Sequence, residues 1–314
     1  MIPFVSPKTG KPLKLHDGYL LADSGEKYTI VKTIPRFVPA DNYASAFGLQ
    51  WKTFSKTQHD KYDHSSLSKD RLERCLGFPL QELKGKTLLE VGSGSGRFTE
   101  LLVDAGTLVH SVDLSVAVEA NKENIGDKEN FIIAQASVYE LPFPKASFDF
   151  VLCIGVIQHT PSPEKTISAL WEMVAPGGKI IMDHYRWRFS YYFNTKPLWR
   201  HYMKRLSPEK SMTKIKKHVA FFFPLHWKYR NNKIASWLLH RISPLIEYIK
   251  VFPERDYQWH YELSLLDTYD SLTDYYKHLR TEKSIYNTLK NLGASKIEVW
   301  RGGNGVEARA VKSA

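Results

Sequence analysis

The sequence predicts an α/β fold with a mostly parallel sheet flanked by helices. Between residues 85 and 184, short apolar runs alternate with helical stretches, which is the pattern of a parallel sheet. A glycine-rich turn directly follows the first of these runs, and a helix follows the turn. Two more strand candidates near the C-terminus bring the predicted sheet to seven strands. The predicted strands are residues 87–91, 108–113, 130–135, 148–154, 179–183, 296–300 and 306–311.

The pattern divides the chain into five parts. Residues 1–40 carry short β-type runs separated by glycine and proline, which predicts a small β-hairpin module. Residues 41–84 are polar with scattered aromatic residues and predict a helical cap or linker. Residues 85–185 are predicted to form the α/β core, which includes a helix over 163–174. A basic, aromatic-rich helical insertion is expected over 186–255, and 256–314 should complete the sheet with a helix near 284–291 and the last two strands.

The net charge of +11 is concentrated in one segment of the chain. Residues 186–250 hold 15 Lys and Arg against two acidic residues, whereas the rest holds 29 basic against 31 acidic residues. Fourteen aromatic residues lie in the same segment. The protein is therefore near neutral apart from one strongly basic, aromatic-rich block.

The composition excludes several classes of protein. Apolar residues make up 43% and charged residues 25%, as in an ordinary globular protein. The two cysteines, Cys75 and Cys153, provide neither a disulfide framework nor a cysteine-based zinc site. No apolar run approaches the ~20 residues of a membrane helix, and the N-terminus lacks the layout of a signal peptide. We expect a soluble, cytoplasmic protein.

The glycine turn has a spacing that distinguishes between two kinds of cofactor. Gly92, Gly94 and Gly96 follow Glu90 at the end of the predicted strand 87–91. A dinucleotide site has the spacing Gly-x-Gly-x-x-Gly, but here the third glycine comes one residue early. Asp113 ends the next predicted strand, where a carboxylate can accept both hydroxyls of a ribose. The spacing therefore disfavours a nicotinamide dinucleotide.

These motifs resemble the class I S-adenosylmethionine-dependent methyltransferases, closely over residues 85–184 and more loosely over 41–84 and 255–312. Further matches are the segments 141–143 and 147–149 before the fourth strand and 175–178 before the fifth. The resemblance implies a Rossmann-like fold and S-adenosylmethionine as the cofactor. It also implies these cofactor-binding residues: Glu90, Gly92, Gly94 and Gly96 at the methionine part, Asp113 at the ribose, Ser137 at the adenine, and the adjacent Leu114 and Val138. The family often has an aspartate where this chain has Ser137, so adenine recognition is expected to differ in detail.

The N-terminal residues 3–39 resemble the small zinc-ribbon module found ahead of some methyltransferases, with the cysteines replaced. Ser6, Thr9, Leu21 and Ser24 stand at the matching positions, and hydroxyls and a leucine are poor zinc ligands. We therefore expect no structural metal, and an unrelated β-hairpin remains an alternative. The module should be held by packing of Leu13, Tyr19, Tyr28, Ile30 and Phe37.

Two histidines are candidates for a general base. His159 follows the fourth predicted strand and His184 follows the fifth, at the edge where this fold binds its ligands. A methyl transfer to oxygen needs a proton removed, for which a histidine near neutral pKa is suited. Either histidine could instead be an ordinary loop residue. Similarly, Trp51 and Phe54 could close over the sulfonium or be core residues of a linker helix.

The basic block falls where this family inserts its acceptor-binding cap. Positive charge with aromatic residues suits an anionic small acceptor, an anionic membrane with a lipid-linked acceptor, or single-stranded nucleic acid. It could also be a solvated helix face. We favour an anionic or lipid-linked acceptor and expect O-methylation of a small-molecule, sugar or lipid-linked substrate. The alternatives are a nucleic-acid methyltransferase and a non-catalytic protein that binds S-adenosylmethionine.

Overall fold

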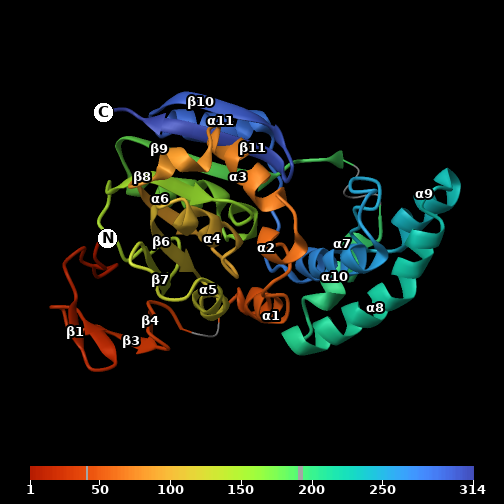
Figure 1. Ribbon diagram of the computed structural model, residues 1–314, viewed down its shortest axis with the longest axis horizontal. Coiled ribbons are helices and arrows are strands. Elements are labelled where there is room, and N and C mark those ends of the chain that lie inside the picture. Colours follow the sequence, from red (N-terminus) through yellow and green to blue (C-terminus); the bar gives the residue numbers. More distant parts are fainter. Residues whose placement is uncertain (40–41, 190–193) are drawn as a thin grey trace.

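A seven-stranded sheet forms the centre of the molecule in the computed structural model, which describes residues 1–39, 42–189 and 194–314 (Figure 1). The strand order is β10-β11-β9-β8-β5-β6-β7. Strand β11 runs antiparallel to both of its neighbours, and the remaining pairs are parallel. The strands are β5 (Thr87–Val91), β6 (Leu108–Asp113), β7 (Phe131–Gln135), β8 (Phe148–Cys153), β9 (Val174–Tyr185), β10 (Ala294–Gly302) and β11 (Gly305–Lys312). The predicted α/β fold with seven mostly parallel strands is confirmed.

Helices cover both faces of the sheet. Successive side chains of a buried strand point to opposite faces, so each strand contributes apolar residues to both sides. In β8, Phe150 and Leu152 belong to the apolar cluster under α3, α4 and α5. Val151 and Cys153 belong to the cluster under α6 and α11. These helices are α3 (Leu67–Leu76), α4 (Arg97–Asp104), α5 (Val118–Ile125), α6 (Pro163–Met173) and α11 (Glu282–Asn291).

Strand β9 is longer than the sequence predicts. The sequence analysis placed a helix over 163–174 and a strand over 179–183, but α6 ends at Met173 and the strand runs from Val174 to Tyr185. Gly177 has a φ of +76°, and the register with β8 shifts between Phe148 and Phe150. This irregularity lets the chain turn directly from helix into strand.

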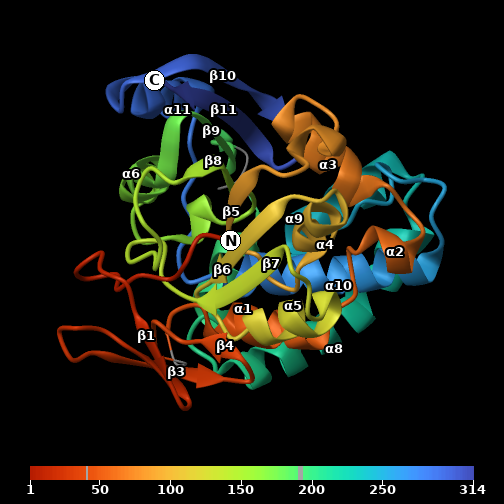
Figure 2. The same ribbon diagram turned by 60° about the vertical axis from the view of Figure 1, so that its left-hand side comes forward.

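The N-terminal module is a separate four-stranded antiparallel sheet beside the β7 edge (Figure 2). The backbone N–H of Phe37 donates to the carbonyl oxygen of Gln135 in β7, at 2.8 Å. Leu13, Tyr28, Ile30 and Phe37 pack against the main core as expected. The module's strands are β1 (Lys14–His16), β2 (Tyr19–Leu21), β3 (Lys27–Val31) and β4 (Ile34–Pro35).

The expectation for Tyr19 is wrong. Its ring stacks on His16 with centroids 5.2 Å apart, while the adjacent Leu20 takes the inward position in the core cluster. Neighbouring residues of a strand face opposite sides, so only one of the two can be inside.

A third apolar cluster lies at the helical end of the molecule, where α8 packs against α10 (Figure 1, right). It consists mainly of the insertion between β9 and α11, and the linker contributes Phe54, the residue that follows α1. Among the described residues, no helix is long and apolar enough to cross a membrane. The helices outside the two faces of the sheet are α1 (Ser45–Thr53), α2 (Asp60–Asp63), α7 (Lys196–Met203), α8 (Pro208–Lys228), α9 (Lys233–Ile242), α10 (Tyr257–Thr273) and the short turns η1 (Leu80–Leu83) and η2 (Ile157–His159).

Candidate active site

A cavity of about 840 Å³ opens at the carboxyl ends of β5, β6 and β8. Its walls come from the turns after these strands, from α1 and α3 of the linker and from α10 of the helical end. Open α/β sheets bind their ligands at this edge, beyond the carboxyl ends of the parallel strands. We call this space the central cavity.

The glycine turn between β5 and α4 forms the floor of the central cavity, and its glycines cannot carry side chains. A Cβ on Gly92 would lie 2.1 Å from Val156 Cγ2, and one on Gly94 would lie 3.1 Å from the Trp51 ring. Both glycines have positive φ, +81° and +54°. The turn can therefore be this close to the cavity only as bare backbone.

Gly96 has a different function from the two glycines that line the cavity. It is the N-cap of α4, with a φ of +94°, and a Cβ there would lie 2.7 Å from Asn121 Oδ1. It does not line the cavity. Gly96 therefore allows α4 to start close to α5, with the helix N-terminus directed at the cavity.

Asp113, at the end of β6, is held against the glycine turn. Its Oδ2 accepts a hydrogen bond from the backbone N–H of Gly94 at 3.0 Å. Its Oδ1 accepts from the backbone N–H and the hydroxyl of Ser115, at 2.8 and 2.7 Å. Burial raises the pKa of Asp113, and these hydrogen bonds act against the rise. The carboxylate lines the cavity next to Leu114 in a fixed orientation.

Glu90 and Ser137 lie behind the cavity wall. Oε2 of Glu90 accepts hydrogen bonds from the hydroxyls of Thr99 and Ser111, at 2.6 and 2.7 Å, so it connects β5 to α4 and β6. Burial raises the pKa of Glu90 to about 7. The Ser137 hydroxyl accepts from the backbone N–H of Tyr139 at 3.2 Å, while Val138 lines the cavity.

Several buried polar atoms around the central cavity lack a hydrogen-bond partner within the described part of the chain. They include Ser93 Oγ, Gln50 Oε1, both amide atoms of Gln158, and Arg71 Nε, all from residues that line the cavity. Buried polar atoms in proteins are almost always paired. Their presence here indicates that the cavity accommodates a ligand with several polar groups.

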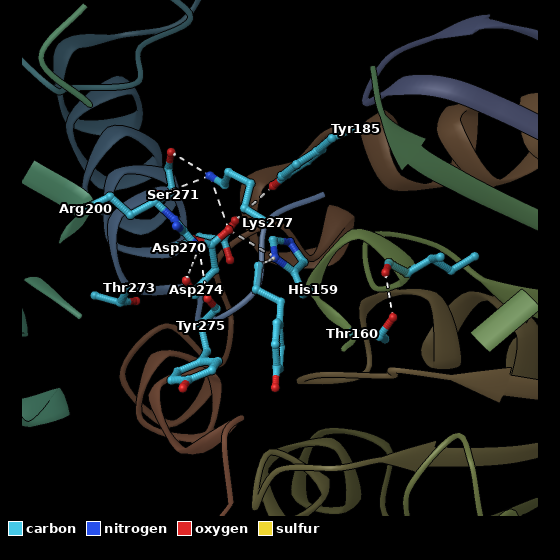
Figure 3. A network of polar contacts seen from close by, with 12 residues as sticks. His159, Thr160, Tyr185, Arg200, Asp270, Ser271, Thr273, Asp274, Tyr275 and Lys277 are labelled. Atoms are coloured by element: carbon cyan, nitrogen blue, oxygen red, sulfur yellow. Dashed lines mark hydrogen bonds and ion pairs between the residues drawn. The ribbon is translucent and has the colours of Figure 1, made fainter. Parts of the chain in front are cut away.

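His159 is the predicted base candidate that reaches the central cavity. It follows β8 in η2, and its Nδ1 lies 3.1 Å from Asp274 Oδ2 and 3.3 Å from the carbonyl oxygen of Tyr276. Burial alone would lower the pKa of His159, but Asp274 and the nearby Asp270 raise it above its ordinary value. Asp274 also forms ion pairs with Arg200 and Lys277 (Figure 3). Arg200 Nε lies 2.7 Å from Asp274 Oδ1, and Lys277 Nζ lies 3.2 Å from Oδ2.

His184 lies elsewhere, within β9 and outside the cavity lining. Its Nδ1 contacts the carbonyl oxygen of Tyr185 at 2.9 Å. Burial lowers the pKa of His184 to about 4, so the ring is neutral near pH 7. Trp51 lines the cavity beside Gly94, whereas Phe54 packs in the helical cluster.

The sequence analysis missed three carboxylates on α10 that line the cavity, Glu262, Asp267 and Asp270. The Tyr248 hydroxyl donates to Asp267 at 2.6 Å, and the Tyr185 hydroxyl donates to Asp270 at 3.2 Å. Burial raises the pKa of Asp267 to about 6 and also raises that of Asp270. The available signal was the spacing of Asp267, Asp270 and Asp274, which are three and four residues apart and so share one face of a helix.

The fold and the cavity define an α/β domain that binds its ligand at the carboxyl edge of a mostly parallel sheet. Residues 89–182 match the family described as "Methyltransferase domain". This part of the chain is therefore a methyltransferase domain of the class I, S-adenosylmethionine-dependent type.

Similar proteins cover only part of the chain. Phosphoethanolamine N-methyltransferase 2 of Caenorhabditis elegans is 35% identical over 107 residues, which are 32% of this chain and 24% of that protein. The ubiquinone biosynthesis O-methyltransferase of Coxiella burnetii is 30% identical over 115 residues, which are 36% of this chain and 49% of that protein. The chain thus spans less than half the length of these curated relatives.

Among solved structures, magnesium protoporphyrin IX methyltransferase from Synechocystis PCC 6803 with bound SAH is similar at 14% identity and a TM-score of 0.46. The match covers 86% of this chain and 97% of that one.

The residues present fit S-adenosylmethionine. The glycine turn leaves room for a ligand directly over the backbone at Gly92 and Gly94. Asp113 lies at the same edge with a carboxylate that can accept hydroxyl hydrogen bonds. Polar atoms of Ser93, Gln50 and Gln158 that have no partner among the described residues also line the cavity. A ligand with an amino acid, a ribose and a base supplies donors and acceptors of these kinds.

Proposed function

We propose that this protein is an S-adenosylmethionine-dependent methyltransferase that methylates an oxygen of a small-molecule, sugar or lipid-linked acceptor. The observation that carries the proposal is that one cavity contains both the residues suited to hold the cofactor and a histidine suited to act as a base. Gly94 and Asp113 lie in its wall on the side of the sheet, and His159, with Asp274 behind it, lies in the same cavity.

The chain's own residues align and enclose the reactants. Gly92, Gly94 and Asp113 hold the cofactor against the sheet, and Trp51 covers the turn from the side of α1. S-adenosylmethionine, when bound, supplies an electrophilic methyl group on its sulfonium. An in-line transfer of that methyl mainly requires alignment and exclusion of water.

His159 removes the acceptor's proton in this proposal. Asp274 and the Tyr276 carbonyl occupy Nδ1, which leaves Nε2 as the nitrogen that faces an acceptor hydroxyl. The proton moves from that hydroxyl to Nε2, and the Asp274 carboxylate stabilises the imidazolium that forms.

The acceptor proposed here is small and carries negative charge. Arg71 and Arg97 line the cavity, and the Arg71 Nε is unpaired within the described residues. Burial, together with the neighbouring Arg71, lowers the pKa of Arg97 to about 9, so an anion beside it would be favourable. One relative is named for phosphoethanolamine, a phosphorylated acceptor, and another for ubiquinone biosynthesis.

We also propose the cytoplasm as the compartment. Cys75 and Cys153 are both free and buried, a state typical of a reducing environment.

Transfer of radiolabelled methyl from S-adenosylmethionine into host-cell extract tests the function. The extract is separated into small-molecule, lipid, polysaccharide, nucleic-acid and protein fractions. We expect label in the small-molecule, lipid or polysaccharide fraction with the wild-type protein and none with Asp113→Ala. An Asp127→Ala variant, which removes an exposed carboxylate far from the cavity, should label like the wild type. Label only in nucleic acid or protein, or none anywhere despite cofactor binding, would contradict the proposal.

A further inference from the structure

Helix α9 presents apolar side chains to the outside of the molecule. Ile234 is 75% exposed, Trp237 56% and Ile242 55%, and Leu238 lies on the same side. Residues three, four and eight apart share one face of a helix, so these side chains form a continuous strip. The opposite face is anchored by the buried Leu239. A helix of a water-soluble surface normally has the reverse arrangement.

Helix α8 presents lysines to the outside. Its inward face carries buried apolar residues such as Ile215, Val219 and Phe223. On the opposite face, the helical spacing aligns exposed residues in one stripe, and the helix ends in a lysine on the same line. This stripe consists of Lys210, Lys214, Lys217, Phe221 and Lys228.

The positive charge of the α8 stripe is not matched by carboxylates in the part of the chain that the structure describes. Within the described residues, none of the lysines of the α8 stripe forms an ion pair with a carboxylate. Lys214 and Lys228 instead lie over the rings of Tyr202 and Tyr229. In the whole segment 186–250 only two acidic residues oppose 15 basic ones.

The lysine stripe of α8 and the apolar strip of α9 do not belong to the central cavity. Of the described residues between 186 and 250, the cavity is lined by Ile246 and Tyr248, and by no lysine or arginine. Figure 1 shows α8 and α9 at the end of the molecule that is farthest from the sheet. A partner that pairs with the lysines of α8 would therefore bind outside the central cavity.

We propose that the apolar strip of α9 and the lysine stripe of α8 dock on the surface of an anionic phospholipid membrane. Apolar and tryptophan side chains beside lysines are the features of helices that lie in the membrane interface. The lysines attract the negative headgroups, while isoleucine, leucine and tryptophan enter the boundary of the acyl chains.

Two other partners are less compatible with these two surfaces. A second copy of the chain would bring a segment of charge +13 against its own equivalent, which is repulsive. Single-stranded nucleic acid would use aromatic stacking, but three of the four residues in the α9 strip, Ile234, Leu238 and Ile242, are aliphatic.

Docking would also bring lipid close to the proposed reaction site, and this part of the inference rests on the proposed function. The chain that leaves α9 returns directly to the cavity wall at Ile246 and Tyr248. An acceptor embedded in the membrane by its lipid could therefore reach the cavity beside the docked helices.

Co-sedimentation with vesicles tests the docking without any need for methyl transfer. We expect the full chain to bind vesicles of phosphatidylcholine with 30% phosphatidylglycerol at least tenfold more tightly than pure phosphatidylcholine. The triple variant Ile234→Ser, Trp237→Ser, Ile242→Ser should lose at least tenfold of this binding, as should Lys210→Gln with Lys214→Gln and Lys217→Gln. All of these side chains are exposed, so the fold should be retained, and thermal unfolding checks this.

Matched variants elsewhere on the surface provide the controls. Leu15→Ser removes an exposed leucine of the N-terminal module, and Lys128→Gln with Lys283→Gln and Lys290→Gln removes three exposed lysines. Neither should change vesicle binding. The proposal is overturned if the wild type does not prefer anionic vesicles, if the α9 variant binds like the wild type, or if the controls lose as much. A lipid-free dimer that the α9 variant abolishes would assign the face to a second copy instead.

Because sedimentation and methyl transfer are separate readouts, the two proposals can fail separately. A protein that binds vesicles but labels no fraction of the extract would contradict the proposed function and leave the docking intact.

Discussion

At the scale of single residues, the two histidines expected beyond the strands differ in their surroundings. His159 lines the central cavity with its Nδ1 beside Asp274, whereas His184 is enclosed in β9. A carboxylate behind one ring nitrogen orients the ring and stabilises its protonated form. The geometry therefore favours His159 as the base over His184.

His159→Gln should reduce methyl transfer by about 10²–10⁴-fold while cofactor binding stays within twofold. Because the pKa of His159 is raised, the wild-type kcat/KM should increase with pH through a value above the ordinary 6.5, and this limb should be absent from the variant. Rates measured between pH 5.5 and 9 check both statements. His184→Gln should lose less than tenfold. If both variants lose less than tenfold, no histidine is the base, and Asp267→Asn becomes the next variant to measure.

Gly94 allows a second prediction with a matched control. Gly94→Ala places a methyl group 3.1 Å from the Trp51 ring inside the cavity, and Gly85→Ala, also at positive φ, finds open space. Both changes should cost about 1 kcal/mol of stability from the backbone conformation. Only Gly94→Ala should also weaken binding of S-adenosylmethionine, by at least tenfold in calorimetric titration. Equal affinities in the two variants would show that the cofactor does not lie over Gly94.

The sequence predicted the residues on the sheet side of the site but not the acidic residues that α10 brings to it, and the reason is physical. Gly92, Gly94 and Asp113 lie at the ends of strands, where a parallel sheet brings them together whatever the rest of the chain does. Asp267 and Asp270 reach the cavity, and Asp274 reaches His159, only because α10 packs back across the carboxyl edge of the sheet. No local pattern predicts that packing.

At the scale of elements, features set by the local sequence were predicted, whereas features set by tertiary packing were not. Alternation of strands and helices was sufficient for the seven-stranded sheet, but the start of β9 depended on an irregular pairing at Gly177. The basic block was visible as composition. Which side of α8 faces outward is determined by the cluster that contains Ile215, Val219 and Phe223, and so by tertiary packing.

Helix α9 has few buried side chains, and an ion pair at its end contributes to holding it. His240 Nε2 lies 2.9 Å from Glu247 Oε1, in the segment that leads back to the cavity. The contact with Glu247 raises the pKa of His240. Burial would raise the pKa of Glu247, but His240 lowers it overall. At a pH between 4.5 and 6.5, the ordinary pKa values of Glu247 and His240, both side chains carry their charge and the ion pair is fully formed.

The pH dependence of this pair follows from linkage. A histidine whose folded pKa is raised stabilises fully below its unfolded pKa of about 6.5, and this stabilisation is lost as the pH rises through the folded pKa. A glutamate whose folded pKa is lowered stabilises above about 4.5, and this is lost as the pH falls. His240→Gln should therefore reduce stability at pH 5.5 and change it little at pH 9.

Because His240 is partly exposed, the loss at pH 5.5 should be at most about 1 kcal/mol. Urea unfolding of the wild type and the variant at the two pH values measures it. His201→Gln, a change at an exposed histidine of α7, is the control and should show no difference between the two pH values. A deficit of His240→Gln that is equal at pH 5.5 and 9 would mean that the ion pair contributes nothing.

At the scale of the whole molecule, the central cavity is where the parts of the chain meet. Its walls combine the glycine turn of the sheet domain, α1 of the linker and α10 of the helical end. A ligand held between these walls binds the folded chain and not the unfolded one. It should therefore stabilise the whole structure and not only the sheet domain.

Thermal unfolding with S-adenosylmethionine at about a hundredfold excess over Kd should show a stabilisation of about 2.7 kcal/mol, or roughly 4 °C in Tm for a chain of this length. Asp113→Ala should abolish this shift because it removes the carboxylate fixed beside Gly94. Asp127→Ala, at an exposed surface pair, should keep it. NAD at the same concentration should leave the Tm unchanged, since the third glycine of the turn, Gly96, comes one residue too early for a dinucleotide site. A shift with NAD and none with S-adenosylmethionine would reassign the cavity to a different cofactor.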